Sequence, residues 1–307
     1  MLRAFHASVS AVSFVSFLAS VSVVLAIASQ AGAQTTDLIG VRAQGMGGAF
    51  TAVADDSTAT WWNPAGLATG AFFNGIIEYT HPPGSDDTIK GVSVAFPALG
   101  VSYYRLPLNQ MRAVAPKGPT GASLEDPGVL TVYGATVAQS AGNHLVIGST
   151  VKLMRADDTN RGLDLGAMAT FGRMRLGVAV RNVNQPEIGS GDTALKLLRQ
   201  ARAGFALTTG TRGVIGSATV AADMDLTTTE AASGEERRFA VGAEAWVPGR
   251  TFGVRGGISL STIGERRTTL SAGASVMTGH GTFVEASLFG GGEEVSRGWG
   301  AALRLTF

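Results

Sequence analysis

Apolar and polar residues alternate along the last ten residues of the chain. One face carries Trp299, Ala301, Leu303, Leu305 and Phe307, and the other carries Gly298, Gly300, Ala302, Arg304 and Thr306. Successive side chains of a β-strand point to opposite faces, whereas a helix with a period of 3.6 residues would spread these two sets around its circumference. The pattern predicts a strand with one apolar face and one mixed face.

The same alternation recurs from residue 71 to the end, in segments of roughly ten residues separated by Gly, Pro, Asn and Asp. We expect about fourteen strands, near 71–80, 88–97, 99–107, 128–140, 144–154, 163–172, 173–184, 197–208, 213–226, 236–247, 250–262, 266–278, 281–290 and 296–307. An even number places both ends of the strand ladder on the same side, as in bacterial barrels.

The connections support this count, because short and long connections alternate along the chain. Those after even-numbered strands are short, such as Pro97-Ala98, Gly172-Arg173 and Pro248-Gly249. Most of those after odd-numbered strands are longer or more polar, including 107–127, 185–196 and 227–235. Barrels of the outer membrane have short periplasmic turns and longer external loops. Around the third strand, Pro97, Leu99 and Pro107 leave two interpretations open, a lateral gap in the pairing or a simple turn.

A soluble β-sandwich or propeller also alternates, but its inner face is apolar. Here the expected inner faces carry arginines and carboxylates, as at Arg255 and Asp223, which a dry core would not accommodate unpaired. Hydrophobic residues make up 45% of the chain and charged residues only 15%, and glycine, at 42 of 307, is about twice as frequent as usual. These observations favour an all-β fold, a transmembrane antiparallel β-barrel over 71–307.

The N-terminus has the pattern of an export signal. Arg3 precedes an apolar run from about Ala11 to Ile27, and Ala31-Gly32-Ala33 forms a small-x-small cleavage site. The alternative is a transmembrane anchor, but serines interrupt the run. We expect residues 1–33 to be a signal peptide cleaved near Ala33, which implies a bacterial outer-membrane location for the barrel. Zero cysteine excludes disulfides, and a net charge of +1 argues against nucleic acid as a partner.

Residues 34–70 lack the alternation and precede the first strand, so we expect them to lie outside the wall, as a hatch inside the lumen. The residues expected to build it are Gly45, Met46, Gly47, Gly48, Asp55, Asp56, Trp61, Trp62, Asn63, Pro64, Ala65 and Gly66. Glycines allow turns and close approach, an acidic residue or Ser57 is expected to cap a short helix, and Pro64 restricts Asn63 to extended or turn conformations. In an extended segment Trp61 and Trp62 would point in different directions.

Chemical interpretations of this stretch are weaker. No Gly-Lys-Ser/Thr follows the glycines, so a phosphate-binding loop is not indicated. The acidic pair lacks a nearby His or Cys, which favours capping or a polar contact over a metal site. His81, His144 and His280 are expected in three different connections, and no His–Ser pair on adjacent strands is apparent. We therefore expect no enzyme activity, no cofactor and no metal.

The stretch RAQGMGGAFTAVADDSTATWWNPAGLA, residues 42–68, resembles the N-terminal hatch of the FadL long-chain fatty acid transporter superfamily, including its shorter PorV/PorQ-like members. Weaker similarity to the PorV-like branch continues in LGVAVRNVNQPEIG, VAADMDL and FAVGAEAWVPGRTFGVRGG. The terminal LRLTF resembles the signal that the outer-membrane assembly machinery reads, which assigns recognition to Phe307.

The resemblance implies two functions. One is a channel or transporter for small hydrophobic solutes, and the other is a PorV/PorQ-like component that assists protein secretion or envelope assembly. Partners implied are outer-membrane lipid, the assembly machinery, and either hydrophobic small molecules or a secretion client. Among the external loops, only 107–127 is long enough to form a lid.

Overall fold

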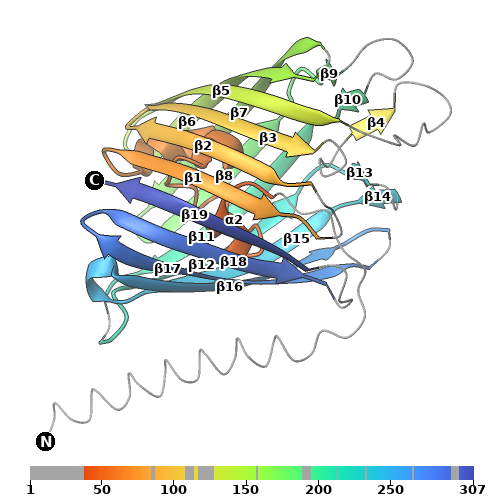
Figure 1. Cartoon of the computed structure of the whole chain (residues 1–307). Helices are drawn as coiled ribbons and strands as arrows, with labels where there is room; N and C mark the ends of the chain where they lie inside the picture. The colour runs from red at the N-terminus through yellow and green to blue at the C-terminus, as the bar shows by residue number, and fades with distance from the viewer. Residues whose placement is uncertain are drawn as a thin grey trace, which may run out of the picture.

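The wall of the molecule is a closed antiparallel barrel in which every strand pairs with two neighbours (Figure 1). The computed structural model describes residues 38–83, 87–107, 114–116, 128–156, 158–188, 195–211, 213–231, 234–264, 266–291 and 297–307. The barrel strands are β1 (Asn74–His81), β2 (Ile89–Phe96), β3 (Leu99–Pro107), β5 (Val129–Ser140), β6 (Leu145–Arg155), β7 (Thr159–Phe171), β8 (Met174–Arg181), β11 (Gln200–Thr209), β12 (Ser217–Asp225), β15 (Arg238–Trp246), β16 (Phe252–Ser261), β17 (Thr268–Gly279), β18 (Thr282–Gly290) and β19 (Arg297–Thr306). Each strand pairs with the next along the wall, and β19 returns to β1.

The predicted ladder of fourteen strands is confirmed, with boundaries shifted by a few residues. One end of the barrel holds the short connections, both ends of the strand ladder and η4 (Pro248–Arg250), a single 3-10 turn. We call this the turn end, and the opposite end, with the longer connections, the loop end. By the rule for outer-membrane barrels, the turn end is the periplasmic one.

Pairing along β3 is continuous on both sides, from Lys90↔Arg105 to Phe96↔Leu99 with β2 and from Leu99↔Val137 to Pro107↔Val129 with β5. Pro97 and Ala98 form a simple turn, in which Ala98 has a φ of 70°. The alternative of a lateral gap beside this strand is therefore not realised in the wall.

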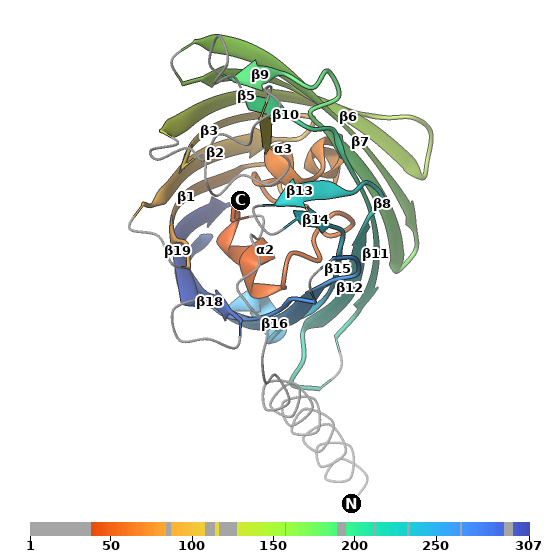
Figure 2. The same ribbon diagram turned by 90° about the vertical axis from the view of Figure 1, so that its right-hand side faces the viewer.

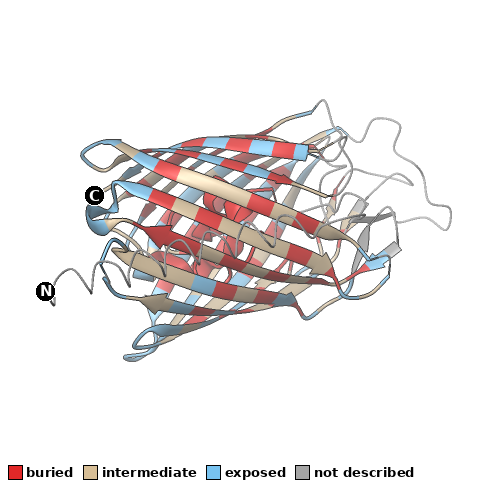
Figure 3. Cartoon of the chain, turned by 90° about the horizontal axis from the view of Figure 1, so that it is seen from below, coloured by how far each residue is buried: buried red, intermediate tan, exposed pale blue. Residues whose placement is uncertain are grey.

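Burial alternates along the strands and separates the two faces of the wall (Figure 3). The outer face carries exposed apolar side chains, for example Val101 at 58%, Val151 at 54% and Leu303 at 44%. The lumen face holds the carboxylates of the described barrel strands, all of them buried: Glu78, Asp164, Asp223, Asp225, Glu244 and Glu285. An apolar outside and a charged inside is the arrangement that lipid imposes on a barrel.

Short strands at the loop end were not predicted. β4 (Val114–Pro116), β10 (Leu195–Leu197) and β9 (Glu187–Ile188) form a small sheet, and β13 (Thr229–Ala231) pairs with β14 (Gly234–Glu236). Of the expected lid at 107–127, residues 108–113 and 117–127 lie outside the described residues.

The expectation that His81 lies in a connection is wrong, because it is the last residue of β1 and pairs with Trp299.

Residues 38–70 lie inside the barrel (Figure 2). They form α2 (Val41–Gly45), α3 (Ala59–Trp62) and the 3-10 helix η1 (Pro64–Thr69). α2 packs against β16 to β19, and η1 packs against β5, β6 and β7. We call residues 38–70 the lumen segment. The predicted signal peptide, 1–33, and the first residues of the predicted hatch, 34–37, lie outside the described residues. No helix in the described ranges is long and apolar enough to cross a membrane.

Candidate functional site: the lumen segment and its seat in the barrel

Glycines on the lumen face of the wall form the seats on which the lumen segment rests. A Cβ at Gly242 or Gly257 would overlap the backbone of Met46, and one at Gly177 would lie 2.5 Å from the carbonyl oxygen of Thr51. A Cβ at Gly148 would lie 2.5 Å from the carbonyl carbon of Pro64. Backbone therefore lies directly on backbone at these points, which only glycine permits. This contact accounts for part of the high glycine content.

The glycines of the lumen segment serve turns and close contacts of their own. Gly47 and Gly48 have φ values of 65° and 76°, in the left-handed region that favours glycine. A Cβ at Gly45 would lie 2.7 Å from Cδ of Arg255, and one at Gly66 would overlap the carbonyl oxygen of Ala54. The sequence had indicated this use of the glycines without naming the partners.

Two wall carboxylates hold backbone amides of the lumen segment. Glu78 on β1 accepts hydrogen bonds from the amides of Gly40, at 2.9 and 3.1 Å, and of Val41, at 3.1 Å, at the start of α2. Asp223 on β12 accepts from Phe50 at 2.9 Å and Thr51 at 2.8 Å. The two strands lie on different sides of the barrel. The segment is thus fixed to the wall at both sides of the lumen.

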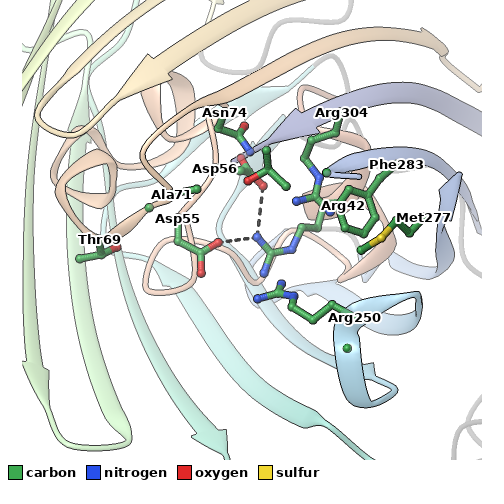
Figure 4. A pocket seen from close by; sticks show the side chains of 14 residues that line it. Arg42, Asp55, Asp56, Thr69, Ala71, Asn74, Arg250, Met277, Phe283 and Arg304 are labelled. Atoms are coloured by element: carbon green, nitrogen blue, oxygen red, sulfur yellow. Dashed lines mark hydrogen bonds and ion pairs between the residues drawn. The ribbon is translucent and has the colours of Figure 1, made fainter. Parts of the chain in front are cut away.

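Arg42 is the centre of a buried ion network (Figure 4). Its guanidinium forms a bidentate ion pair with the carboxylate of Glu244, through two hydrogen bonds of 2.8 Å each. It also contacts Asp55 at 2.5 Å and Asp56 at 3.2 Å. Glu244 continues to Arg255 at 3.3 Å. A buried charge is tolerable only when it is paired and hydrogen-bonded, and removing one partner of such a pair typically costs about 3–5 kcal/mol.

The network continues along the wall to Glu285. This carboxylate contacts Arg255 at 3.6 Å and Arg304 at 3.0 Å, and it accepts a hydrogen bond from Ser275 at 2.6 Å. The chain of charges therefore runs from the lumen segment across β15 to β19. The alternation had placed such charges on the lumen face, but it could not show which of them pair.

The expectation that Asp55, Asp56 or Ser57 caps the short helix is wrong. The N-cap of α3 is Thr58, and no side chain caps it. Asp55 instead pairs with Arg42 and, at 3.5 Å, with Arg175 on β8. Burial alone raises the pKa of Asp55, but the guanidinium groups of Arg42 and Arg175 outweigh it and hold this pKa below its usual range. Asp56 bonds the amide of Thr58 at 3.0 Å, a local turn just before the helix.

Asn63 joins two parts of the lumen segment to the wall. Its side-chain amide donates to the carbonyl oxygens of Thr51, at 2.9 Å, and of Ala167 on β7, at 3.2 Å. Its side-chain oxygen accepts from the amide of Ala65 at 3.2 Å, which starts η1 directly after Pro64. Asn63 is fully buried, so each of these bonds replaces one that water would otherwise supply.

The two adjacent tryptophans occupy different environments, although they lie in one helical turn rather than an extended segment. Trp62 is buried within the lumen segment, donates to the carbonyl oxygen of Ile39 at 2.9 Å and packs edge-on against Phe50. Trp61 faces the wall and packs edge-on against Tyr104 at 5.6 Å between ring centres. Trp61 thus borders the apolar part of the lumen.

An apolar cluster fills the loop end of the lumen. It combines residues of the lumen segment, of the wall and of the small sheet: Leu38, Ile39, Ile89, Tyr104, Leu106, Leu130, Val132, Met154, Ile188, Leu197 and Phe289. We call this the loop-end cluster. Its wall members project inward from β2, β3, β5, β6 and β18, where a water-filled pore would carry polar side chains. The alternation did not reveal this cluster, although Leu106, Leu130 and Met154 lie on the same strand faces as the inward polar residues.

A cavity of about 620 Å³ opens at the turn end, on the other side of the lumen segment. Its lining mixes charged and apolar groups, among them Arg42, Asp55, Arg304, Met277 and Phe283 (Figure 4). A path through the barrel would therefore run from the loop-end cluster, past the lumen segment, into this cavity.

Within the described ranges, no group of three or more His, Asp and Glu is arranged to hold a metal ion.

At the end of the wall, the amide of Phe307 donates to the carbonyl oxygen of Phe73 at 3.0 Å. The amide of Phe73 donates to the carbonyl oxygen of Phe307 at 3.2 Å. Phe307 is 65% exposed, on the outer face. Its role in assembly stays a prediction.

The closed antiparallel barrel, the apolar outer face and the chain folded into the lumen define an outer-membrane type of β-barrel. Comparison with solved structures narrows this to the fold of the FadL-like barrels. The CymD monoaromatic hydrocarbon channel matches with a TM-score of 0.61 at 14% identity, over 89% of this chain and 99% of that one. The toluene transporter TbuX of Ralstonia pickettii matches with a TM-score of 0.57 at 12% identity, over 88% and 99%. A FadL homologue of Pseudomonas aeruginosa matches with a TM-score of 0.55 at 10% identity, over 91% of this chain and 99% of that one.

No protein-family model matches the sequence. No curated protein matches it either. At these identities the likeness to the solved structures establishes the fold.

Proposed function

We propose that this protein is an outer-membrane channel for small hydrophobic solutes, and not an enzyme. The observation that carries the proposal is the loop-end cluster. Its buried leucines, Leu106 and Leu130, make the lumen apolar directly beneath the outer connections, where a pore for polar solutes would carry polar side chains. A solute that moves between these apolar side chains would pass Trp61 and reach the turn-end cavity. The shared fold supports the proposal, because CymD is described as a monoaromatic hydrocarbon channel and TbuX as a toluene transporter.

Uptake of radiolabelled toluene by intact Gram-negative cells that display the protein tests this function. Cells with the wild-type protein should take up toluene faster than cells with an empty vector. The Leu130→Asp variant should reduce this gain in uptake several-fold, because it puts a carboxylate, which desolvation disfavours, into the apolar loop-end cluster.

Leu130→Met is the matched control, since a change of similar volume that stays apolar costs little. It should keep the wild-type rate, and heat-modifiable migration on a gel should show a folded barrel for both variants. Uptake no faster than with the empty vector would contradict the channel. If export of an envelope protein instead depended on the chain, the secretion or assembly role that the sequence resemblance implies would be favoured.

A further inference from the structure

Charge on the outer face of the described barrel strands is confined to cations. No Asp or Glu of these strands points outward, whereas exposed basic residues do: Lys90, Arg105, Arg155, Arg161 and Arg297. Each stands at or near the loop end of its strand. Charged side chains on a lipid-facing wall are costly near the midplane and tolerated at the interface, so their level is informative.

Most of these cations form a continuous row across β2, β3, β5, β6 and β7. Lys90 lies directly opposite Arg105, Arg105 opposite Thr131, and Thr131 opposite Arg155. Arg161 is the diagonal neighbour of Arg155, since it pairs with Leu153. We call Lys90, Arg105, Arg155 and Arg161 the basic row. Like charges directly opposite on neighbouring strands destabilise a sheet, and a bound anion between them would remove this repulsion.

The basic row lies at the depth of lipid headgroups. On β3, Tyr103 lies two residues from Arg105 toward the middle of the barrel. On β5, Tyr133 likewise lies two residues from Thr131 toward the middle. These two rings pack together with 5.3 Å between their centres, and both are exposed. Two residues further along β3 follows the aliphatic Val101. Aromatic residues mark the boundary between hydrocarbon and headgroups, so the cations beyond them reach the headgroup phosphates.

An apolar groove continues from the row toward the barrel middle. It has a volume of about 430 Å³, begins at Lys90, and is lined by Ile77, Val92, Tyr103 and Leu303 across β1, β2, β3 and β19. A phosphate at the row and a hydrocarbon chain in this groove would belong to a single lipid molecule.

The cations are asymmetric in two directions. The turn ends of the same strands carry apolar outer residues such as Phe96, Leu99 and Leu145, all exposed. The outer faces of β8, β11, β12, β15, β16 and β17, within their described residues, carry no charged residue. A general preference for cations at membrane interfaces would not produce this bias toward one end and one side of the barrel.

We infer that the basic row binds the phosphates of a phosphorylated glycolipid of the outer leaflet, of the lipid A type, with an acyl chain in the groove below Lys90. The inference rests on the outer-membrane location of the proposed function but not on solute transport. It assigns β2 to β7 as the side of the barrel that holds an ordered lipid.

The full-length protein in phosphatidylcholine nanodiscs doped with bisphosphorylated lipid A tests the inference by native mass spectrometry. The wild type should retain lipid A, and the Lys90→Gln/Arg105→Gln double variant should bind it on the order of tenfold more weakly. Lipid A without its phosphates should bind the wild type as weakly as the phosphorylated form binds the variant.

Arg173→Gln/Arg266→Gln is the matched control, because it removes the same charge from exposed residues outside the row. It should bind lipid A like the wild type. Equal binding by both double variants, or equal binding of both lipids to the wild type, would overturn the inference. Toluene uptake by the Lys90→Gln/Arg105→Gln variant should stay at the wild-type rate, so failure of the lipid site and failure of the channel are distinguishable.

Discussion

Single residues decide how the lumen segment sits, because its backbone rests on the backbone of the wall. Gly242 and Gly257 face each other on β15 and β16, and Met46 lies on both. A side chain at either position would occupy the space that the lumen segment fills. Arg42 and Asn63 then fix the same segment through charge and hydrogen bonds.

Gly257→Ala should therefore displace the lumen segment while leaving the wall intact. The methyl group overlaps the backbone of Met46 and Gly47, and overpacking of this kind typically costs about 1–3 kcal/mol. Arg42 is buried, so trypsin should cleave after it faster in the variant than in the wild type, as followed by mass spectrometry.

Gly256→Ala is the neighbouring control, since residue 256 points to the outer face of the same strand. Its cleavage after Arg42 should match that of the wild type. Equal cleavage in Gly257→Ala and Gly256→Ala would contradict the seating described here.

At the scale of elements, the barrel strands were predictable and the small strands were not. Each wall strand faces lipid on one side and the lumen on the other, so alternation is forced along eight or more residues. β4 and β10 span three residues each and β9 two, too short for a period to appear. The lumen segment could be recognised in the sequence because it lacks alternation. Its partners on the wall could not be predicted, since Arg42 and Glu244 are 202 positions apart and only the closed barrel brings them together.

The assignment of faces predicts a strong dependence on depth along β6. Val151 stands near the middle of the strand on the outer face, so Val151→Arg should lower the free energy of unfolding by about 2–4 kcal/mol. Leu145→Arg, at the turn end of the same face, should cost about 0–1 kcal/mol. Urea unfolding in lipid vesicles measures both. Similar costs at the two positions would mean that residue 151 does not face the hydrocarbon.

At the scale of the whole molecule, the wall and the lumen segment have separable tasks. The wall closes its own hydrogen-bonded ladder through β1 and β19, which needs nothing from the interior. The lumen segment lies between the loop-end cluster and the turn-end cavity, and its contacts with Glu78, Asp223 and Glu244 reach opposite sides of the barrel. We infer that it closes the path and that the barrel stands without it.

Planar-bilayer conductance tests this central claim most directly, on the wild type and on a variant that lacks Gly45 to Ala65. The account predicts that the deletion variant still shows heat-modifiable migration and opens channels of clearly larger conductance than the wild type, because the lumen is no longer filled. A deletion variant that folds into a barrel and conducts no more than the wild type would contradict it.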